Sequence, residues 1–291
     1  MTQSTPAPAG ETNIPARVDG DGYSAKVLFS PLNQRIQVLE YEAEDLRALV
    51  MDLENQARKA DFGKIFLKAP MHEKPDLEGA GMSAEAIVTG YFAGLSAVVM
   101  SLFLNEERSR RPFAQEQEGI LAKIRSRAAD DSVPELPGGY RLLLAGPGDA
   151  VDLAGLYAEV FASYPFPITD PEYIRMTMDS NVLYRIVRDP GGVMVAAASA
   201  EINDSFRNAE MTDFATLPDQ RGLGLAQHIL ADLEGDMGER GIPNLYTIAR
   251  ARSAGMNRVF YNRGYRLTGT LVNNCHIAGQ FEDMHVWCKG A

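Results

Sequence analysis

The sequence predicts a mixed α/β protein made of two consecutive units, each with helices packed on a mixed sheet. Three observations lead to this prediction. In the larger unit strand-like runs alternate with helices, a glycine-rich turn joins one strand to one helix, and a smaller unit near the start repeats part of that order. Such an arrangement of elements favours an α/β architecture.

The composition limits the kinds of function to consider. Hydrophobic residues make up 45% and charged residues 23% of the 291 residues, as in ordinary soluble globular proteins. The net charge of −11 argues against nucleic acid as a partner and is compatible with a small cationic substrate. Two cysteines are too few for a disulfide framework, and neither they nor the four histidines have metal-ligand spacing. No metal is therefore expected.

The chain divides into four segments. Residues 1–20 are rich in Pro, Ala and Thr and are expected to form a disordered tail. Residues 21–110 form the smaller unit, residues 111–138 a polar linker, and residues 139–291 the larger unit. No apolar run is long enough to span a bilayer, and no signal peptide is recognised, so we expect a cytoplasmic protein that does not bind membranes.

The pattern of apolar residues predicts the elements in order. In the smaller unit we expect a helix over 44–60, a strand over 64–68, a short helix before Gly81, and strands over 85–91 and 97–104. In the larger unit we expect a strand over 141–144, helices over 150–161 and 172–179, and strands over 183–188, 193–202 and 209–217. A helix over 225–239, a strand over 244–249, a helix over 254–262 and strands over 266–273 and 284–288 complete it.

The two units share a pattern. Residues 54–82 and 234–265 each show a helix, a glycine, a strand, a short helix and a second glycine, and two strands follow in both cases. We interpret the smaller unit as a degenerate copy of the back half of the larger one; coincidence between two ordinary α/β segments is the alternative. No glycine-rich turn precedes the 44–60 helix, so the smaller unit is not expected to bind a phosphate-bearing cofactor. It could cover the substrate cleft or form a homodimer interface.

The glycine-rich turn at 218–226 lies between a strand and a helix. Helix N-termini expose unpaired N–H groups and attract anions, and Gly222 and Gly224 let the backbone approach a phosphate closely. A plain helix start with flexible glycines is the alternative. The P-loop pattern fails because Leu225 follows Gly224, and the dinucleotide pattern fails at Gln227. The turn therefore indicates a diphosphate site of another kind.

The spacing Arg-Gly-x-Gly-x-Ala at 221–226 resembles the acetyl-CoA loop of the GNAT acetyltransferase superfamily. The runs 163–167, 209–218, 246–251 and 271–274, and Gly90-Tyr91-Phe92 in the smaller unit, resemble β-lysine N6-acetyltransferases over nearly the whole chain. The resemblance implies a GNAT acyl-CoA N-acyltransferase fold preceded by a smaller GNAT-like half domain. It also implies transfer of an acetyl group from acetyl-CoA to the terminal amine of β-lysine, giving an osmolyte.

The resemblance also implies a set of residues that bind acetyl-CoA. Backbone groups of the strand before the loop should pair with the pantetheine arm: Phe214, Ala215, Thr216 and Leu217. The diphosphate should lie on the amides of the loop: Gln220, Arg221, Gly222, Leu223, Gly224, Leu225 and Ala226. In the family an Asn contacts the cofactor and a Tyr acts as the general acid. At the corresponding positions this chain has Ser253 and Phe260, which are two departures from the family pattern. Asn257 lies one helical turn from Ser253 and could contact pantetheine instead.

Proton transfer needs a base, because a primary amine is mostly charged at neutral pH. Glu210 and Asp213 both lie on the strand before the loop. Regular alternation would place them on opposite faces of the sheet, so either could be the base, but not both. Tyr261 is a weak substitute for the missing acid because it is turned about 100° from the usual position. Solvent could protonate the leaving thiolate instead.

Substrate-binding residues follow from the charges of β-lysine. Asn273, Asn274 and Arg250 or Arg252 could bind its carboxylate. Tyr164 and Phe166, in a proline-rich loop, are expected to form a wall of the site. Two other functions remain compatible with the sequence: acetylation of another amine, such as a polyamine, an amino acid or a protein lysine, and non-catalytic sensing of acetyl-CoA.

Overall fold

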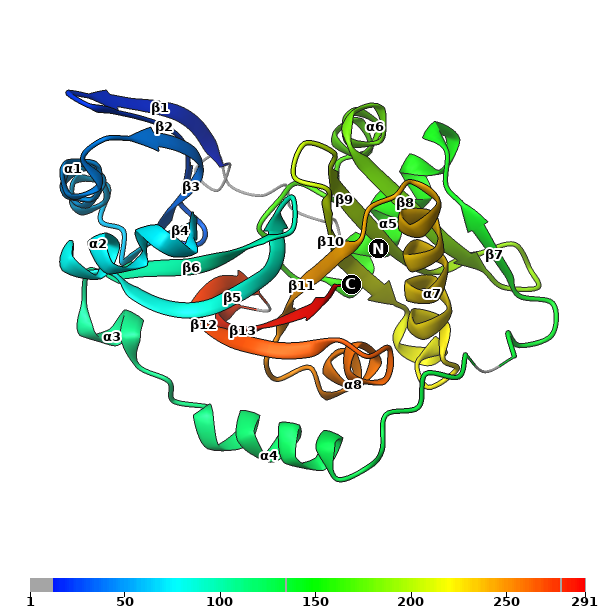
Figure 1. Cartoon of the computed structure of the whole chain (residues 1–291). Coiled ribbons are helices and arrows are strands. Elements are labelled where there is room, and N and C mark those ends of the chain that lie inside the picture. The colour runs from blue at the N-terminus through cyan, green and yellow to red at the C-terminus, as the bar shows by residue number, and fades with distance from the viewer. Residues whose placement is uncertain (1–12, 134, 278, 291) are drawn as a thin grey trace.

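The computed structural model describes residues 13–133, 135–277 and 279–290. It contains a six-stranded sheet of order β1-β2-β3-β4-β6-β5 and a seven-stranded sheet of order β12-β13-β11-β10-β9-β8-β7 (Figure 1). Both sheets are mixed. Among the described residues, no helix combines the length and the apolar character that a membrane span requires.

The first sheet is built by the N-terminal half of the chain. Its strands are β1 (Ile14–Gly20), β2 (Tyr23–Ser30), β3 (Arg35–Ala43), β4 (Lys64–Pro70), β5 (Ser83–Phe92) and β6 (Leu95–Phe103). Helices α1 (Leu46–Lys59) and α2 (Lys74–Gly79) join β3 to β4 and β4 to β5. Helices α3 (Glu106–Ser109) and α4 (Ala114–Arg125) lie in the connection to the second sheet.

The C-terminal half builds the second sheet. Its strands are β7 (Arg141–Leu144), β8 (Val182–Arg188), β9 (Met194–Asn203), β10 (Asn208–Thr216), β11 (Asn244–Arg250), β12 (Arg266–Ile277) and β13 (Gln280–Lys289). Its helices are α5 (Ala150–Val160), α6 (Pro171–Ser180), α7 (Leu225–Glu239) and α8 (Ala254–Asn262). Every element that the sequence predicted is present, with ends that shift by a few residues.

The two halves repeat one topology. Strands β1 to β6 correspond in order and pairing to β8, β9, β10, β11, β12 and β13, and in each half one parallel pair follows a crossover helix, β3 with β4 and β10 with β11. The repeat is longer than the sequence indicated, because it includes β1, β2 and β3, which were not predicted. The prediction of a disordered tail over 1–20 is wrong for β1, which pairs with β2 from Ile14 to Gly20. Residues 1–12 lie outside the described part of the chain.

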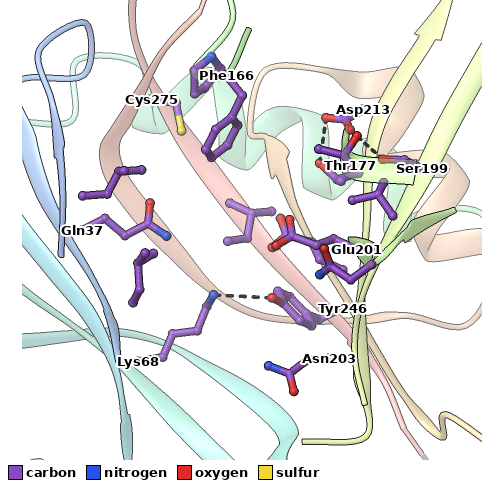
Figure 2. Close-up of a pocket in the computed structure, with 18 of the residues that line it drawn as sticks. Gln37, Lys68, Phe166, Thr177, Ser199, Glu201, Asn203, Asp213, Tyr246 and Cys275 are labelled. Atoms are coloured by element: carbon purple, nitrogen blue, oxygen red, sulfur yellow. Dashed lines mark hydrogen bonds between the residues drawn. The ribbon is translucent and has the colours of Figure 1, made fainter. Parts of the chain in front are cut away.

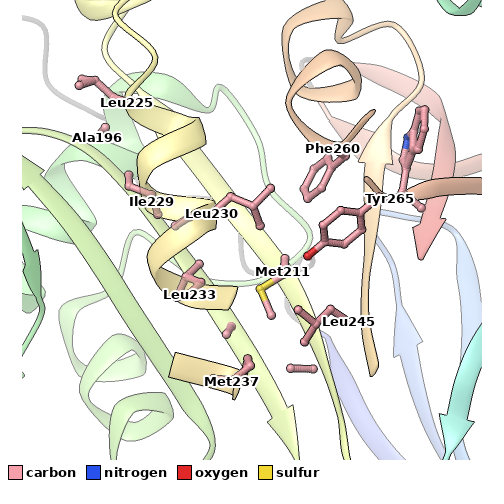
Figure 3. Packing of buried hydrophobic residues seen from close by; sticks show 14 of the residues in the cluster. Ala196, Met211, Leu225, Ile229, Leu230, Leu233, Met237, Leu245, Phe260 and Tyr265 are labelled. Carbon is pink, nitrogen blue, oxygen red and sulfur yellow. The ribbon is translucent and has the colours of Figure 1, made fainter. Parts of the chain in front are cut away.

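Each crossover helix buries one apolar face on its own sheet. In α1 the buried residues Leu49, Leu53 and Ala57 recur every fourth position, which is the period of one helix face. In α7, Leu225, Ile229, Leu230, Leu233 and Met237 pack on Met211 of β10 and Leu245 of β11 (Figure 3). Helices α5 and α6 belong to a separate cluster that packs on β8 and β9.

The two halves pack through β5 and β12. A Cβ at Gly269 would lie 2.2 Å from the Glu85 carbonyl oxygen, so glycine permits this close approach. The buried Lys64 ammonium lies 2.7 Å from the Glu85 carboxylate and donates to the Val272 carbonyl at 2.9 Å, while the Val272 amide donates to Glu85 at 2.6 Å. A shared apolar cluster continues this junction. The first half is therefore held against the site formed by the second.

Candidate active site

The site begins where two parallel strands separate. Strands β10 and β11 pair from Asn208–Asn244 to Glu210–Tyr246, and the ladder ends there although both strands continue. From Met211 onward the edge of β10 that faces β11 therefore has free backbone groups. The cleft that opens between the strands is bordered by the N-terminus of α7 and by α8.

A bulge in β10 lies at this point. The pairing of β10 with β9 shifts between Thr212 and Ala215, and Asp213 takes a left-handed conformation with φ of 56°. A bulge interrupts the alternation of side chains along a strand. Glu210 and Asp213 consequently line the same cavity, and the prediction that they face opposite sides of the sheet is wrong.

The first of two cavities, which we call the thioester cavity, has a volume of about 650 Å³ and reaches the glycine-rich turn. Gly222 and Gly224 have φ values of 85° and 74°, and Gly224 caps α7 without a side-chain hydrogen bond. Among the residues that the structure describes, the N–H groups of residues 221–226 donate to no backbone carbonyl. These amides have the arrangement that the predicted diphosphate site requires.

Most of the predicted cofactor residues line the thioester cavity. They are Phe214, Thr216, Gln220, Arg221, Gly222, Gly224, Leu225, Ala226, Ser253 and Phe260. Three do not. Ala215 is buried in the core, Leu223 is exposed outside the cavity, and the Leu217 amide donates to the Val195 carbonyl at 3.0 Å. Leu217 is therefore already paired within the sheet.

Helix α8 places its polar residues differently from the prediction. Asn257 is fully buried, donates to the Arg250 carbonyl at 2.9 Å and accepts from the Trp287 indole at 2.8 Å. It holds α8 on the sheet and does not line the cavity. Tyr261 also lies outside it, with Arg258 over its ring at 5.6 Å. Phe260 lines the cavity with its ring packed edge-on against Phe214.

A second cavity, which we call the amine cavity, has a volume of about 500 Å³ and meets the thioester cavity. Six residues line both: Tyr164, Thr212, Asp213, Ile248, Ile277 and Met284. One wall of the amine cavity comes from the second sheet and includes Glu201, while the facing wall comes from the first sheet and includes Gln37 and Lys68 (Figure 2). Both halves of the chain thus build this cavity.

Two acidic side chains of the amine cavity, Glu210 and Asp213, have raised pKa values. Burial raises the pKa of Glu210 to about 7; Lys68 partly offsets the shift, and the opposing Glu201 adds to it. Burial also raises the pKa of Asp213, against the effect of hydrogen bonds from Ser199 and Tyr164, each at 2.6 Å. A carboxyl with a pKa near 7 can accept a proton at neutral pH and release it again.

The predicted substrate residues are divided between different places. Tyr164, Phe166 and Asn274 line the amine cavity. Asn273 does not: its amide donates to the carbonyls of Arg108 and Arg110, so it ties β12 to α3.

Neither arginine proposed for the substrate carboxylate lines the amine cavity. Arg250 lines the thioester cavity and lies 3.3 Å from the Glu282 carboxylate. Arg252 pairs with Glu116 of α4 at 3.2 Å and stacks on Phe113. Both are engaged by acidic partners within the chain.

The residues of the amine cavity that sequence reasoning missed include Lys68, Glu201 and Tyr246. Glu201 lies directly across from Glu210 in the β9–β10 ladder, a relation that the predicted hairpin could have revealed. Tyr246 is the last β11 residue paired with β10. Lys68 comes from the other half, and no local pattern in the sequence connects it to this site.

The fold and the two joined cavities together place the protein among the acyltransferases. A family model described as the acetyltransferase (GNAT) family matches residues 153–265. The chain is 37% identical to the N-acetyltransferase YodP of Bacillus subtilis over 96% of this chain and 97% of that protein. It is 36% identical to a β-lysine N(6)-acetyltransferase of Methanococcus maripaludis over 90% of this chain and 95% of that protein.

Solved structures also match. A GCN5-related N-acetyltransferase from Kribbella flavida aligns at 16% identity and a TM-score of 0.45, covering 53% of this chain and 99% of that one.

The chain therefore belongs to the GNAT family of acetyltransferases, and it is an N-acetyltransferase. Acetyltransferases of this family use acetyl-CoA. The thioester cavity fits such a ligand: it offers unpaired amides at an uncapped helix, two glycines of positive φ, and a strand edge with free backbone groups.

Proposed function

We propose that the chain acetylates the terminal N6 amine of β-lysine with acetyl-CoA, and that the product serves as an osmolyte. The 36% identity to a β-lysine N(6)-acetyltransferase over nearly the full length of both proteins supports this substrate. The acidic amine cavity carries the proposal, because it places carboxylates beside the opening to the thioester cavity. A cationic diamine acid complements such a cavity.

In this proposal the diphosphate of acetyl-CoA lies on the amides of residues 221–226, where the α7 dipole favours negative charge. Arg221 lines the same cavity and adds a positive charge. The pantetheine arm runs along the free edge of β10 beyond Glu210, making strand-like hydrogen bonds. This path brings the thioester to the bulge at Asp213, which lies in both cavities.

We assign the role of base to Glu210. Its carboxylate takes a proton from the substrate ammonium, directly or through water, and the neutral nitrogen attacks the thioester carbon. The C–N bond forms as the C–S bond breaks, the electron pair leaves on sulfur, and the nitrogen gives up its second proton to the departing thiolate or to water. Asp213 attracts the ammonium, but its oxygens already accept from Ser199 and Tyr164, which makes it the less suitable base.

Two further groups assist this transfer. The bulge leaves residues 213–214 out of the ladder with β9, so the Phe214 N–H can donate to the carbonyl oxygen as negative charge develops on it. The thiol of CoA, with an ordinary thiol pKa near 8.5, leaves as a thiolate without a side-chain acid. The proposed reaction therefore needs no acid at Phe260, where the family has a tyrosine.

The test is release of free CoA by the purified chain with acetyl-CoA and one amine at a time. We expect β-lysine to give a much higher kcat/KM than L-lysine or putrescine. Equal rates for all three amines would keep the acetyltransferase and remove β-lysine as the substrate. Binding of acetyl-CoA without release of CoA with any amine would favour a sensing role.

A further inference from the structure

The proposed substrate has more charges than the mechanism uses. β-Lysine carries a terminal ammonium, a second ammonium at C3 and a carboxylate. Glu210 and Asp213 account for the terminal amine. The acidic wall formed by Glu201 and Glu210, which face each other across β9 and β10, attracts ammonium groups and repels a carboxylate. The substrate carboxylate therefore needs a positive group on another wall.

Lys68 supplies a positive group on the facing wall. It lies on β4 of the first sheet, and its side chain points across the amine cavity toward the second sheet (Figure 2). Its ammonium lies 3.4 Å from the Tyr246 hydroxyl and 5.0 Å and 5.4 Å from the ring centres of Tyr91 and Tyr246. These contacts hold the ammonium at the cavity surface.

Lys64 shows what a satisfied lysine on the same strand looks like. Its ammonium is buried and lies 2.7 Å from the Glu85 carboxylate. Lys68 has no carboxylate oxygen within 4.0 Å among residues 13–133, 135–277 and 279–290. A lysine held by two aromatic rings and one hydroxyl keeps hydrogen-bond donors for an external anion.

The charge state of Lys68 suits this role. Burial lowers the pKa of its ammonium, but the Tyr91 hydroxyl and two acidic side chains outweigh burial, and the net shift is upward. Lys68 is therefore a cation throughout the neutral range. Arg35 also lines the cavity, but its Nη1 donates to the Asn274 carbonyl, its Nη2 donates to Gln37 Oε1 at 3.4 Å, and its guanidinium stacks on Phe66 at 4.7 Å, so both terminal nitrogens are engaged within the chain.

We propose that Lys68 binds the carboxylate of the substrate and so selects amino acids over simple diamines. The inference rests on the proposed function, since it assigns a second group of the same substrate. The two walls then orient the molecule: the ammonium groups lie on the acidic wall of the second sheet, and the carboxylate lies against the first sheet. The N-terminal half thus acts as a specificity wall for chemistry carried out by the C-terminal half.

A matched pair of substrates tests the proposal on the wild-type chain. 1,4-Diaminopentane is β-lysine without its carboxylate, and both can be acetylated at the same terminal amine. A charged hydrogen bond contributes about 1.5–3 kcal/mol, so kcat/KM for β-lysine should exceed that for 1,4-diaminopentane by roughly 10- to 100-fold. Equal values with the two substrates would overturn the carboxylate role without any variant.

The variant Lys68→Gln then identifies the residue. It should lower kcat/KM for β-lysine by roughly 10- to 100-fold and leave that for 1,4-diaminopentane within about 3-fold of wild type. Lys59→Gln, at an exposed lysine of α1, is the control and should change neither value. The rates are compared at a pH where activity is maximal for each variant, because removing Lys68 also removes a charge that lowers the pKa of Glu210.

The outcomes separate the two proposals. Equal losses with both substrates in Lys68→Gln would mean that Lys68 acts through Glu210 or through folding, and the carboxylate role would be wrong. Turnover of 1,4-diaminopentane or putrescine but not of β-lysine by the wild-type chain would overturn the proposed function, and the carboxylate role with it.

Discussion

Helices α1 and α7 occupy the same position in the two halves, yet their N-termini are chemically different. Each joins two strands that pair in parallel, β3 to β4 and β10 to β11. In α1 the Asp45 carboxylate accepts the Ala48 amide at 3.0 Å and so fills the anion site with the chain's own negative charge. In α7 the capping residue is Gly224, and its amides stay open. The capping residue and its backbone conformation thus distinguish the closed N-terminus of α1 from the open one that we propose binds the diphosphate.

The same contrast appears on the strands. The ladder between β3 and β4 ends at Gln37–Phe66, and the ladder between β10 and β11 ends at Glu210–Tyr246. Gln37 therefore corresponds to the proposed base, but its amide cannot accept a proton at neutral pH. The two halves share one scaffold, and we propose that a few polar residues decide which half carries out chemistry.

The first half retains a part of the site nevertheless. Gln37, Phe66 and Lys68 all line the amine cavity, and they come from the two strands that separate in that half. The opening between β3 and β4 faces the acidic wall and closes the cavity of the other half. The place that corresponds to the cleft of the second half is thus a wall of the amine cavity in the first half.

The largest effect on kcat is expected when Glu210 is replaced by glutamine, the residue at the corresponding position of the first half. Glu210→Gln should lower kcat by roughly 10²- to 10⁴-fold, because it removes the proposed general base while keeping the shape of the side chain. Gln37→Ala should change kcat by less than about 5-fold, since Gln37 only borders the substrate. Steady-state CoA release with β-lysine measures both. Comparable losses in the two variants would remove the distinction between the halves.

A smaller effect is expected at the helix N-termini. Gly224→Asp places a carboxylate beside the open amides of α7, where it repels a diphosphate, although the φ of 74° at this position differs from the extended backbone from which Asp45 caps α1. We expect the Kd for acetyl-CoA to rise by roughly 10- to 100-fold, measured by calorimetry. Gly238→Asp, in the last part of the same helix, adds the same charge far from the turn and is the control. Unchanged affinity in Gly224→Asp would place the diphosphate elsewhere.

The cofactor turn could be predicted from the sequence because its signal is local. Two glycines between a strand and a helix indicate both a turn with positive φ and a helix N-terminus with open amides. The bulge at Asp213 has no such signal, since aspartate is also an ordinary strand residue, and regular alternation therefore gave the wrong face for it. Strand β1 was missed because the Pro, Ala and Thr content of the N-terminal residues, Pro15 included, suggested a tail, although an edge strand tolerates proline.

The substrate site could be predicted only in part, because it depends on contacts between distant segments. Lys68 and Glu201 face each other across the cavity from different halves of the chain. Asparagines such as Asn257 and Asn273 often contact ligands. Here the Asn257 side chain accepts from the Trp287 indole. The Asn273 side chain donates to backbone carbonyls of α3 and of the residue that follows it. Polar residues at a plausible spacing can equally well fix the scaffold, and the sequence does not distinguish the two roles.

The pH dependence of kcat sharpens the assignment of Glu210. The base works as a carboxylate, and its pKa is raised to about 7 in the folded protein. We therefore expect kcat to fall about 10-fold for each unit of pH below 7 and to level off above it, with a single proton involved. The acid limb should disappear in Glu210→Gln and persist in Asp213→Asn. Its persistence in Glu210→Gln would assign the limb to another group.

The smallest effect is expected at the N-terminus of α1, which Asp45 caps. Asp45→Ala removes the cap of α1, so the free energy of unfolding should fall by about 1 kcal/mol, while the Kd for acetyl-CoA stays at its wild-type value. Asp45→Asn keeps an oxygen that can accept the Ala48 amide and should lose less. Urea denaturation and calorimetry measure the two quantities. A change in acetyl-CoA affinity without a loss of stability would mean that α1, too, contributes to ligand binding, and the functional division between the two helices would then be wrong.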